Sequence, residues 1–229
     1  LAPLELAPIG LGRMASDPML VEIPPHPLFS GQGGSGVAPA TEDLDRILTQ
    51  VVIPKTITVH LGAPSASASN VTVSFVTYIA TVASGEIYPT WPEQALRANI
   101  LAQISLALNR IYTEWYLSKG YSFDITGSPS YDQIYTHGRT IFESVKKIAE
   151  EIFNTYVRKT GTFNPYFTEY CDGKTVTCKG MSQWDTVTKA NQGLSALRIL
   201  KSYYGNDLEL ITTQNIAGIP RSYPGSPLR

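Results

Sequence analysis

Alternating apolar and polar residues predict two β-strands in the first half of this chain. In residues 55–61 and 70–75 every second side chain is apolar, which is the pattern of strands with one buried face. The Ala- and Ser-rich stretch 63–69 lies between them. It predicts a connecting loop.

Apolar residues at three- and four-residue steps predict the helices. The strongest pattern covers residues 92–119, where Pro92 suits the first helical turn and Gly120 suits the position after the last one. We expect three shorter helices: over 75–83, breaking near Ser84 and Gly85; over 139–159; and over 186–204, interrupted at Gln192 and Gly193.

The two ends of the chain lack such periodicity. Residues 1–50 are rich in Pro and Gly and predict an extended N-terminal arm, with a short helix from Thr41 to about Val51. Residues 213–229 are turn-rich and predict a linker. We therefore expect an α+β fold, with one helix-rich domain and a few short strands over residues 51–212.

The composition narrows the classes of ligand. Only 16% of the 229 residues are charged and the formal net charge is −1, whereas Tyr occurs 13 times. Nucleic-acid binding and polybasic membrane docking both need a basic face, so we expect neither partner. No stretch reaches the roughly 18 apolar residues that span a bilayer. A neutral polar surface suits hydroxyl-rich ligands such as glycans.

Glu86 is the best candidate for acid/base chemistry. It is the one carboxylate among Val, Ile, Tyr, Trp and Pro residues just before the helix expected at Pro92. Apolar surroundings raise the pKa of a Glu towards the value that a general acid needs. The alternative is that Glu86 caps that helix or places a negative charge at its N-terminus. The residues leave both interpretations open.

Three motifs in order resemble a known enzyme family. The first is Gly85-Glu86 with the Pro, Trp and Ala-Leu-Arg-Ala residues of 89–98, followed by Gln103 and Ser105. The second is Asp132-Gln133-Ile134-Tyr135, and the third is Gly180-Met181-Ser182-Gln183 with the helix after it. Over about residues 56–210 they resemble the stage II sporulation protein D family of peptidoglycan lytic transglycosylases. Residues 86–92, 109–116 and 170–173 are most similar to its clostridial branch of germination-specific spore cortex-lytic enzymes.

The resemblance implies a catalytic domain over 51–212 that acts on peptidoglycan glycan strands of spore cortex or cell wall during germination. Such enzymes cleave the bond between N-acetylmuramic acid and N-acetylglucosamine and leave 1,6-anhydro ends. The resemblance also implies an extracytoplasmic location, no cofactor, an activating protease acting on a pro-region, and a peptidoglycan-binding domain after the linker. It assigns the acid/base role to Glu86 and substrate binding to Tyr88, Gln133, Ser182 and Gln183.

Each binding residue also has a purely structural interpretation. Tyr88 could pack against Trp91, Gln133 could cap a helix near Arg139, and Ser182 could be the N-cap of the last helix. One position departs from the family. Asp185 stands where relatives usually have Gly two residues after the motif Gln. Either Asp185 only begins the following helix, since Asp is favoured at an N-cap, or its carboxylate alters the geometry of the expected cleft.

Cys171 and Cys178 are the only cysteines, and two interpretations remain. Some members of the resembled family bind zinc in this region through two cysteines and a histidine. No histidine lies in 163–170 here, so zinc would need His137, His60 or an acidic residue as a further ligand. In an extracytoplasmic setting a local disulfide is the simpler outcome, and we favour it.

Two other functions stay open. An N-acetylmuramoyl-L-alanine amidase would need a metal-activated water, and the scarcity of histidines argues against it. A noncatalytic wall-binding or amidase-enhancing module is the other, and Asp185 favours it.

Overall fold

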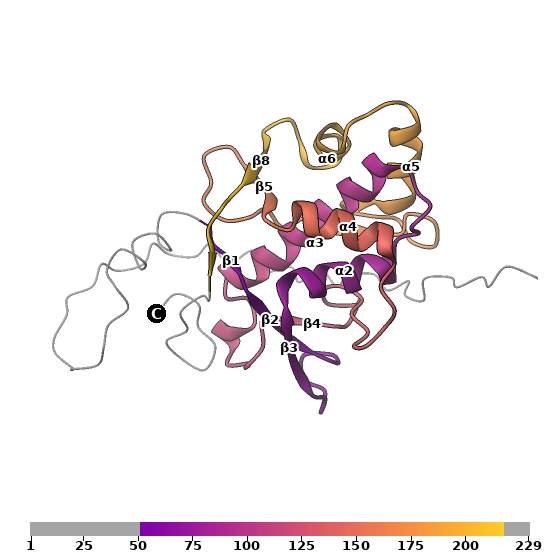
Figure 1. Cartoon of the computed structure of the whole chain (residues 1–229). Helices are drawn as coiled ribbons and strands as arrows, with labels where there is room; N and C mark the ends of the chain where they lie inside the picture. Colours follow the sequence, from indigo (N-terminus) through magenta and orange to yellow (C-terminus); the bar gives the residue numbers. More distant parts are fainter. Residues whose placement is uncertain (1–50, 218–229) are drawn as a thin grey trace, which may run out of the picture.

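The computed structural model describes residues 51–217 (Figure 1). The expected N-terminal arm, with all but the last residue of its short helix, and most of the expected linker lie outside the described residues. The described part is a mixed α+β fold, which confirms the predicted class. In this part no helix is long and apolar enough to cross a membrane.

A small sheet forms one edge of the fold. Strand β2 (Thr56–His60) pairs in antiparallel fashion with β3 (Asn70–Ser74) and in parallel with β4 (Ile125–Thr126), which gives the order β3-β2-β4. The apolar residues of β2, Ile57 and Val59, are fully buried. The two strands predicted from alternation are therefore confirmed.

Helix α2 (Phe75–Glu86) follows β3 directly. Its N-cap Ser74 accepts a hydrogen bond from the Thr77 N–H at 3.1 Å. The helix was predicted to break near Ser84 and Gly85, and it ends one residue later, at Glu86. Both residues are buried in its last turn, where the Ser84 hydroxyl accepts the N–H of Phe142. Tertiary packing therefore outweighs the weak helix propensity of the Ser-Gly pair.

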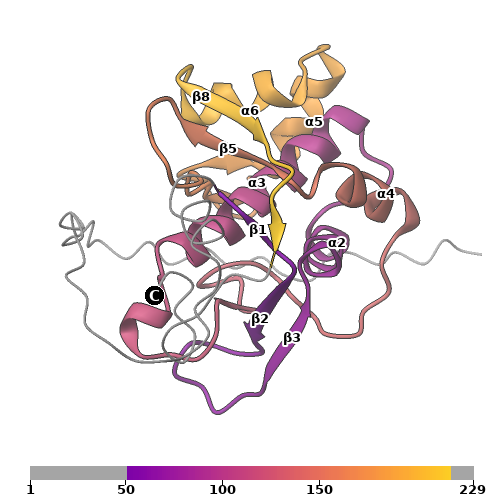
Figure 2. The same ribbon diagram turned by 60° about the vertical axis from the view of Figure 1, so that its left-hand side comes forward.

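Helix α3 (Glu93–Tyr112) is the central element. It packs against α2, against α4 (Glu143–Ile152), against the pair α5 (Gln183–Asn191) and α6 (Ala196–Tyr204), and against β5 (Thr155–Lys159). Figures 1 and 2 show it running between the β2–β3 hairpin on one side and α5, α6 and β8 (Leu208–Thr212) on the other. A helix covered in this way is buried nearly all round.

The end of α3 differs from the prediction. The helix stops at Tyr112 because Glu114 takes a left-handed conformation (φ 49°), which an α-helix cannot continue. A short 3₁₀ helix (Leu117–Lys119) follows and ends at Gly120, whose φ of 85° suits glycine. At the other end Pro92 is the N-cap rather than a residue of the first turn.

The single helix predicted over 139–159 was also wrong, because the segment divides into α4 and β5. The sequence Thr155-Tyr156-Val157 is β-branched and aromatic and favours a strand. It pairs in antiparallel fashion with β8. Residues 155–159 therefore form a strand because they pair with β8, about fifty residues away, although their local periodicity predicts a helix.

Two short parallel pairs complete the fold. Strand β6 (Tyr170–Cys171) pairs with β7 (Met181–Ser182), and β1 (Ile53–Pro54) pairs with β9 (Ile216–Ala217) (Figure 2). Because β9 belongs to the expected linker, the folded part extends past the boundary expected at residue 212. The predicted interruption at Gln192 and Gly193 is confirmed, and Gly193 has a φ of 85°.

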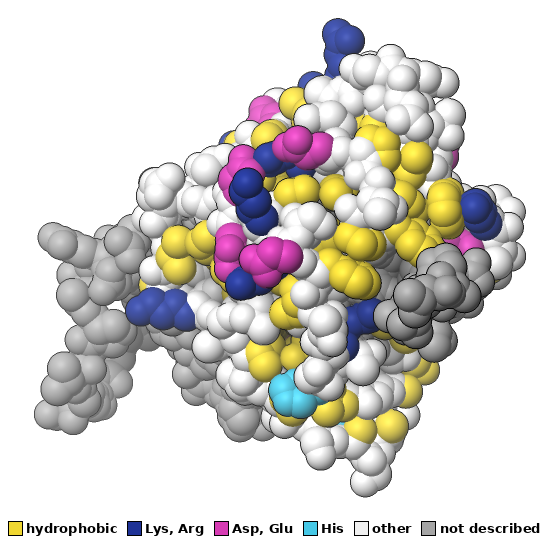
Figure 3. All heavy atoms as spheres, turned by 45° about the vertical axis from the view of Figure 1, so that its right-hand side comes forward, with side chains coloured by type: hydrophobic (Ala, Val, Ile, Leu, Met, Phe, Trp, Pro, Cys, Tyr) yellow, Lys and Arg dark blue, Asp and Glu magenta, His cyan; other side chains and the backbone are white. Residues whose placement is uncertain are grey.

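The surface shown in Figure 3 combines a broad band of apolar side chains with neighbouring clusters of opposite charge. One ion pair joins α3 and α4 at the surface. Arg97 of α3 bonds Glu151 of α4 at 2.7 Å, and it also bonds Glu93 of its own helix at 2.8 Å. Exposed pairs of this kind add little stability. The buried core beneath the ion pair therefore contributes most of the stability of the contact between α3 and α4.

Candidate active site

Glu86 is the last residue of α2, and only 9% of it is exposed. It does not cap the helix that follows, since α3 begins after Pro92 with no side-chain cap. The capping interpretation was therefore wrong. At the C-terminal end of α2 the helix dipole disfavours a negative charge, which adds to the effect of burial.

The Glu86 carboxyl group is held by donors from four separate segments. Its Oε1 accepts the backbone N–H of Ile134 at 2.8 Å. Its Oε2 accepts Nε2 of Gln103 at 3.1 Å and Nε2 of Gln183 at 3.3 Å. The hydroxyl of Tyr170 is a further hydrogen-bond donor to the carboxyl group. All four donors are neutral.

A second layer orients these donors. Gln133 accepts the Tyr78 hydroxyl on its Oε1 at 2.8 Å. Its Nε2 donates to the Gln103 carbonyl and to the Tyr170 hydroxyl, both at 3.1 Å. Because the Tyr170 oxygen accepts this bond, its own proton is free to point at Glu86. Gln133 thus supports the carboxyl group without touching it.

Burial raises the pKa of Glu86 to about 7, and the hydrogen bonds from Tyr170, Ile134, Gln103 and Gln183 limit the rise. The direction follows from the surroundings, because desolvation penalises the ionised form and no cation bonds to it. A carboxyl group with this pKa is present in both protonation states near neutrality. It can therefore give up a proton and take one back.

A buried ion pair fixes the segment that carries Gln133 and Ile134. Asp132 accepts Nε of Arg110 at 2.7 Å, and both side chains are buried. The second oxygen of Asp132 accepts the Tyr116 hydroxyl at 2.5 Å and both the N–H and the hydroxyl of Thr126, at 2.9 and 2.7 Å. Every oxygen of this carboxylate is satisfied, so the segment that follows it is fixed, with the Ile134 N–H against Glu86 and Gln133 behind it.

The predicted binding residues fall into two groups. Gln183 bonds Glu86 directly, and Gln133 bonds it through Tyr170. The expectation that Gln133 caps a helix near Arg139 was wrong, because its side chain is buried in the site. Ser182 and Tyr88 make no hydrogen bond to Glu86 among the described contacts.

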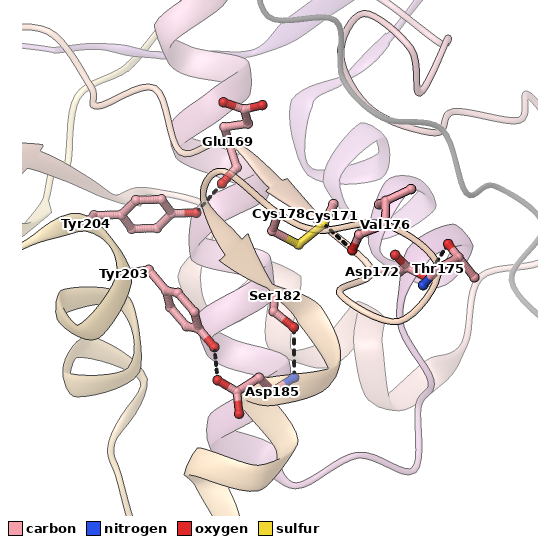
Figure 4. The surroundings of a disulfide bond; sticks show 10 residues. All are labelled: Glu169, Cys171, Asp172, Thr175, Val176, Cys178, Ser182, Asp185, Tyr203 and Tyr204. Carbon is pink, nitrogen blue, oxygen red and sulfur yellow. Dashed lines mark hydrogen bonds between the residues drawn. A yellow bond between two sulfur atoms is a disulfide. The ribbon is translucent and has the colours of Figure 1, made fainter.

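Ser182 and Tyr88 follow their structural interpretations. Ser182 is the N-cap of α5 and accepts the Asp185 N–H at 3.3 Å (Figure 4). The Tyr88 ring lies 5.8 Å from Trp91 and 5.5 Å from Trp184, and the two tryptophans lie 4.9 Å apart. These three rings, here called the aromatic group, lie within five residues of Glu86 or next to Gln183 in the sequence.

Asp185 is occupied away from Glu86. Its carboxylate pairs with Lys189 at 2.8 Å and accepts the Tyr203 hydroxyl at 2.6 Å (Figure 4). It lies in the first turn of α5, where a negative charge is favourable. Asp185, the residue that departs from the pattern of the resembled family, is therefore not a hydrogen-bond partner of Glu86.

The sequence interpretation assigned no role in the site to Gln103, Tyr170, Tyr78 or the Ile134 N–H. Gln103 was recognisable, since it is a polar residue seven positions after Leu96 on the apolar side of a helix. A backbone N–H gives no signal in a sequence. Tyr170 and Tyr78 reach the site only through long-range packing.

Cys171 and Cys178 form a disulfide, with their Cα atoms 5.4 Å apart (Figure 4). Neither sulfur is therefore left as a thiolate that could bind zinc. The bridge closes a loop between β6 and β7. Within this loop the Asp172 carboxylate accepts the N–H and the hydroxyl of Thr175 at 2.9 and 2.7 Å. A cavity of about 380 Å³ lies beside this loop, bounded also by Ser182 and Tyr203.

Residues 51–217 contain no group of three or more His, Cys, Asp or Glu side chains that could hold a metal ion. The two histidines among the described residues form hydrogen bonds to other polar side chains. His60 pairs with Asn70 at 2.8 Å, and His137 pairs with Tyr135 at 3.1 Å.

Comparison of the chain with protein-family models gave no match, and comparison with curated proteins gave none. The function must therefore be inferred from the residues of the site and from the sequence motifs.

Proposed function

We propose that this protein is a peptidoglycan lytic transglycosylase in which Glu86 is both the catalytic acid and the catalytic base. One observation carries the proposal: a buried carboxyl group with a pKa of about 7, held only by neutral donors. The three motifs that resemble the stage II sporulation protein D family support it, because they supply Glu86, Gln133 and Gln183.

A single carboxyl group can serve both steps of this reaction. Protonated Glu86 gives its proton to the glycosidic oxygen as the bond from that oxygen to the anomeric carbon of N-acetylmuramic acid breaks. The 6-hydroxyl of the same sugar then attacks the anomeric carbon and forms the 1,6-anhydro ring. Ionised Glu86 takes the hydroxyl proton and is restored. No water is consumed.

The reaction therefore needs no second carboxylate. Ordinary glycosidases place two carboxyl groups about 5–9.5 Å apart, one of them to attack or to activate water. Here the substrate's own hydroxyl replaces that group. Within residues 51–217, no other carboxyl group is among the hydrogen-bond partners of Glu86.

The hydrogen-bond donors around Glu86 favour its ionised form, which exists after it has given its proton to the substrate. Gln103 and Gln183 point N–H groups at Oε2, so they stabilise the negative charge that forms there. They are already in place and need little rearrangement during the step. The half-buried Tyr88 and Trp184 of the aromatic group offer ring surface of the kind that lines ligand sites.

In this proposal the substrate is spore cortex or cell-wall glycan, degraded during germination, and the protein acts outside the cytoplasm. The Cys171–Cys178 disulfide fits such a setting, because disulfides persist in oxidising compartments. An activating protease and a following peptidoglycan-binding domain remain parts of the proposal that rest on the resemblance alone.

Product analysis tests the reaction class. Purified cortex and vegetative wall are digested with the protein, and the soluble fragments are identified by mass spectrometry. We expect 1,6-anhydro-N-acetylmuramic acid ends. Ordinary reducing ends would mean hydrolysis, free stem peptides would mean an amidase, and bound but uncut wall would mean a noncatalytic module. Any of these three results would contradict the proposal.

A further inference from the structure

Arg139 carries a partly buried positive charge that no described residue neutralises. Its Nε is buried and has no hydrogen-bond partner. No carboxylate of the described residues lies within ion-pair distance of its guanidinium, and burial lowers its pKa. A buried polar group left unpaired is costly, so its presence calls for an explanation, and a bound partner is one of them.

The other described arginines do not share this situation. Arg97, Arg110 and Arg158 each pair with at least one carboxylate, at distances from 2.7 to 3.3 Å. Arg198 lies exposed on α6, where water solvates its charge. Arg139 is therefore the one arginine between residues 51 and 217 that is partly removed from water without a carboxylate partner.

The Arg139 guanidinium lies against Gly85, the residue that precedes Glu86. A Cβ atom added to Gly85 would come within 2.5 Å of its Nη1 and 3.5 Å of its Cζ, so the guanidinium covers the face of Gly85. The next residue is Glu86. The Ile134 side chain lies at the same spot, 3.6 Å from that added atom, and the Ile134 N–H bonds Glu86. Glycine at position 85 leaves the room that the guanidinium occupies.

The chemistry of the group defines its partner. A guanidinium presents its donors in a planar fork that matches a carboxylate, and it remains charged throughout the pH range of proteins. Glu86 is not that partner, because its oxygens are bonded to four neutral donors and it forms no ion pair with Arg139. The guanidinium therefore suits a carboxylate brought by a ligand.

We propose that Arg139 binds a carboxylate of the substrate strand next to the bond that Glu86 cleaves, and so restricts the enzyme to acidic glycans. This inference rests on the proposed function. Peptidoglycan offers carboxylates from two sources, the stem peptide and the lactyl group of muramic acid once the stem has been removed. A neutral polymer of N-acetylglucosamine has neither.

Three forms of the same strands separate these sources. One form keeps its stem peptides, one has had them removed and exposes the lactyl carboxylate, and one keeps stems whose carboxylates have been converted to amides. Initial rates of anhydro-end release are measured for the wild type and for Arg139→Gln. We expect KM to rise about tenfold on the carboxylate-bearing form that Arg139 binds, with kcat within about twofold. The amidated strands should give both proteins the same KM.

Two further variants control for structure. Arg158→Gln removes an arginine of similar exposure that pairs with Glu209 on the β5–β8 ribbon, and it should leave KM unchanged on all strands. Arg139→Lys keeps the charge without the fork and should recover part of the lost KM. Thermal unfolding of each variant should match the wild type. A kcat loss of equal size on all three forms, or an unchanged KM on both carboxylate forms, would overturn the inference.

Binding distinguishes this inference from the proposed function. If the wild type releases no anhydro ends, the proposed function fails, but co-sedimentation with the three insoluble forms still tests Arg139. Carboxylate-dependent binding that Arg139→Gln weakens about tenfold would support the inference. Equal binding by the two proteins would reject it.

Discussion

Two buried carboxyl groups of this protein differ in what surrounds them. Asp132 has a guanidinium partner and three donors from hydroxyl and amide groups, so its charge is compensated. Glu86 has donors but no cation. The first arrangement suits a structural anchor and the second suits a group that exchanges protons.

The pH dependence of activity follows from the raised pKa of Glu86. Cleavage needs the protonated form in the free enzyme, and this form predominates below a pKa of about 7. We expect kcat/KM to fall about tenfold for each pH unit above 7 and to be level, as far as this group is concerned, between 5 and 7. Rates on purified cortex over pH 4–9 measure the profile. A decline that begins near 4.5, the ordinary value for Glu, would contradict the burial argument.

At the scale of single residues, the sequence identified a site residue where an ionisable side chain lies among apolar neighbours. Glu86 stood out because it is one carboxylate among large apolar residues. Gln183 was assigned to the site through its motif. The Ile134 N–H could not be predicted, because only the conformation of the 132–134 segment aims it at Glu86.

At the scale of elements, the parallel pair β6–β7 delivers two of the four donors. Tyr170 lies on β6, and Gln183 follows β7 as the first residue of α5. The disulfide closes the loop between the two strands. Since each strand has only two residues, their pairing alone offers little stability.

Replacing both cysteines by serine therefore has two expected effects. The covalent loop is short, so the free energy of unfolding should fall by about 2 kcal/mol. Looser positioning of Tyr170 and Gln183 should also lower kcat/KM. Urea denaturation and rates on cortex measure these effects, and a reducing agent should impair the wild type while leaving the double variant unchanged. Full activity in the double variant would show that the bridge does not position the donors.

The segment after β4 depends on the Asp132 network in the same way. Asp132→Asn leaves the Arg110 charge buried and unpaired, so it should lower the free energy of unfolding by about 3 kcal/mol. Glu209→Gln breaks the half-exposed pair with Arg158 and should cost less than about 1 kcal/mol. Urea denaturation compares them. Similar small losses in both would mean that the network does not anchor the segment.

The elements were predicted well where one local pattern is decisive. Strands β2 and β3 and the start of α3 follow from alternation, periodicity and Pro92. Residues 139–159 were mispredicted because Ile141, Val145, Ile148 and Ile152 fit one helical stripe, and the helix was expected to continue through Val157. The division of this segment into α4 and β5 depends on the pairing of β5 with β8, which lies about fifty residues later in the sequence.

At the scale of the whole molecule, the site exists because α3 gathers distant segments. Glu86 precedes α3, Gln103 lies within it, and Ile134 and Gln183 follow it by many residues. The α+β class could be predicted from the mixture of periods. The convergence of these segments could not, because no local pattern reveals which distant residues meet around a buried helix.

The most direct test of the account is the release of 1,6-anhydro ends by Glu86→Gln. Glutamine keeps the shape of the side chain but has no proton to exchange near neutral pH. We predict a drop of about a thousandfold in the rate on purified cortex, with thermal unfolding close to that of the wild type. Glu93→Gln, which changes an exposed carboxylate in the first turn of α3, should remain fully active. Anhydro-end release by Glu86→Gln at a rate near that of Glu93→Gln would contradict the role assigned to Glu86.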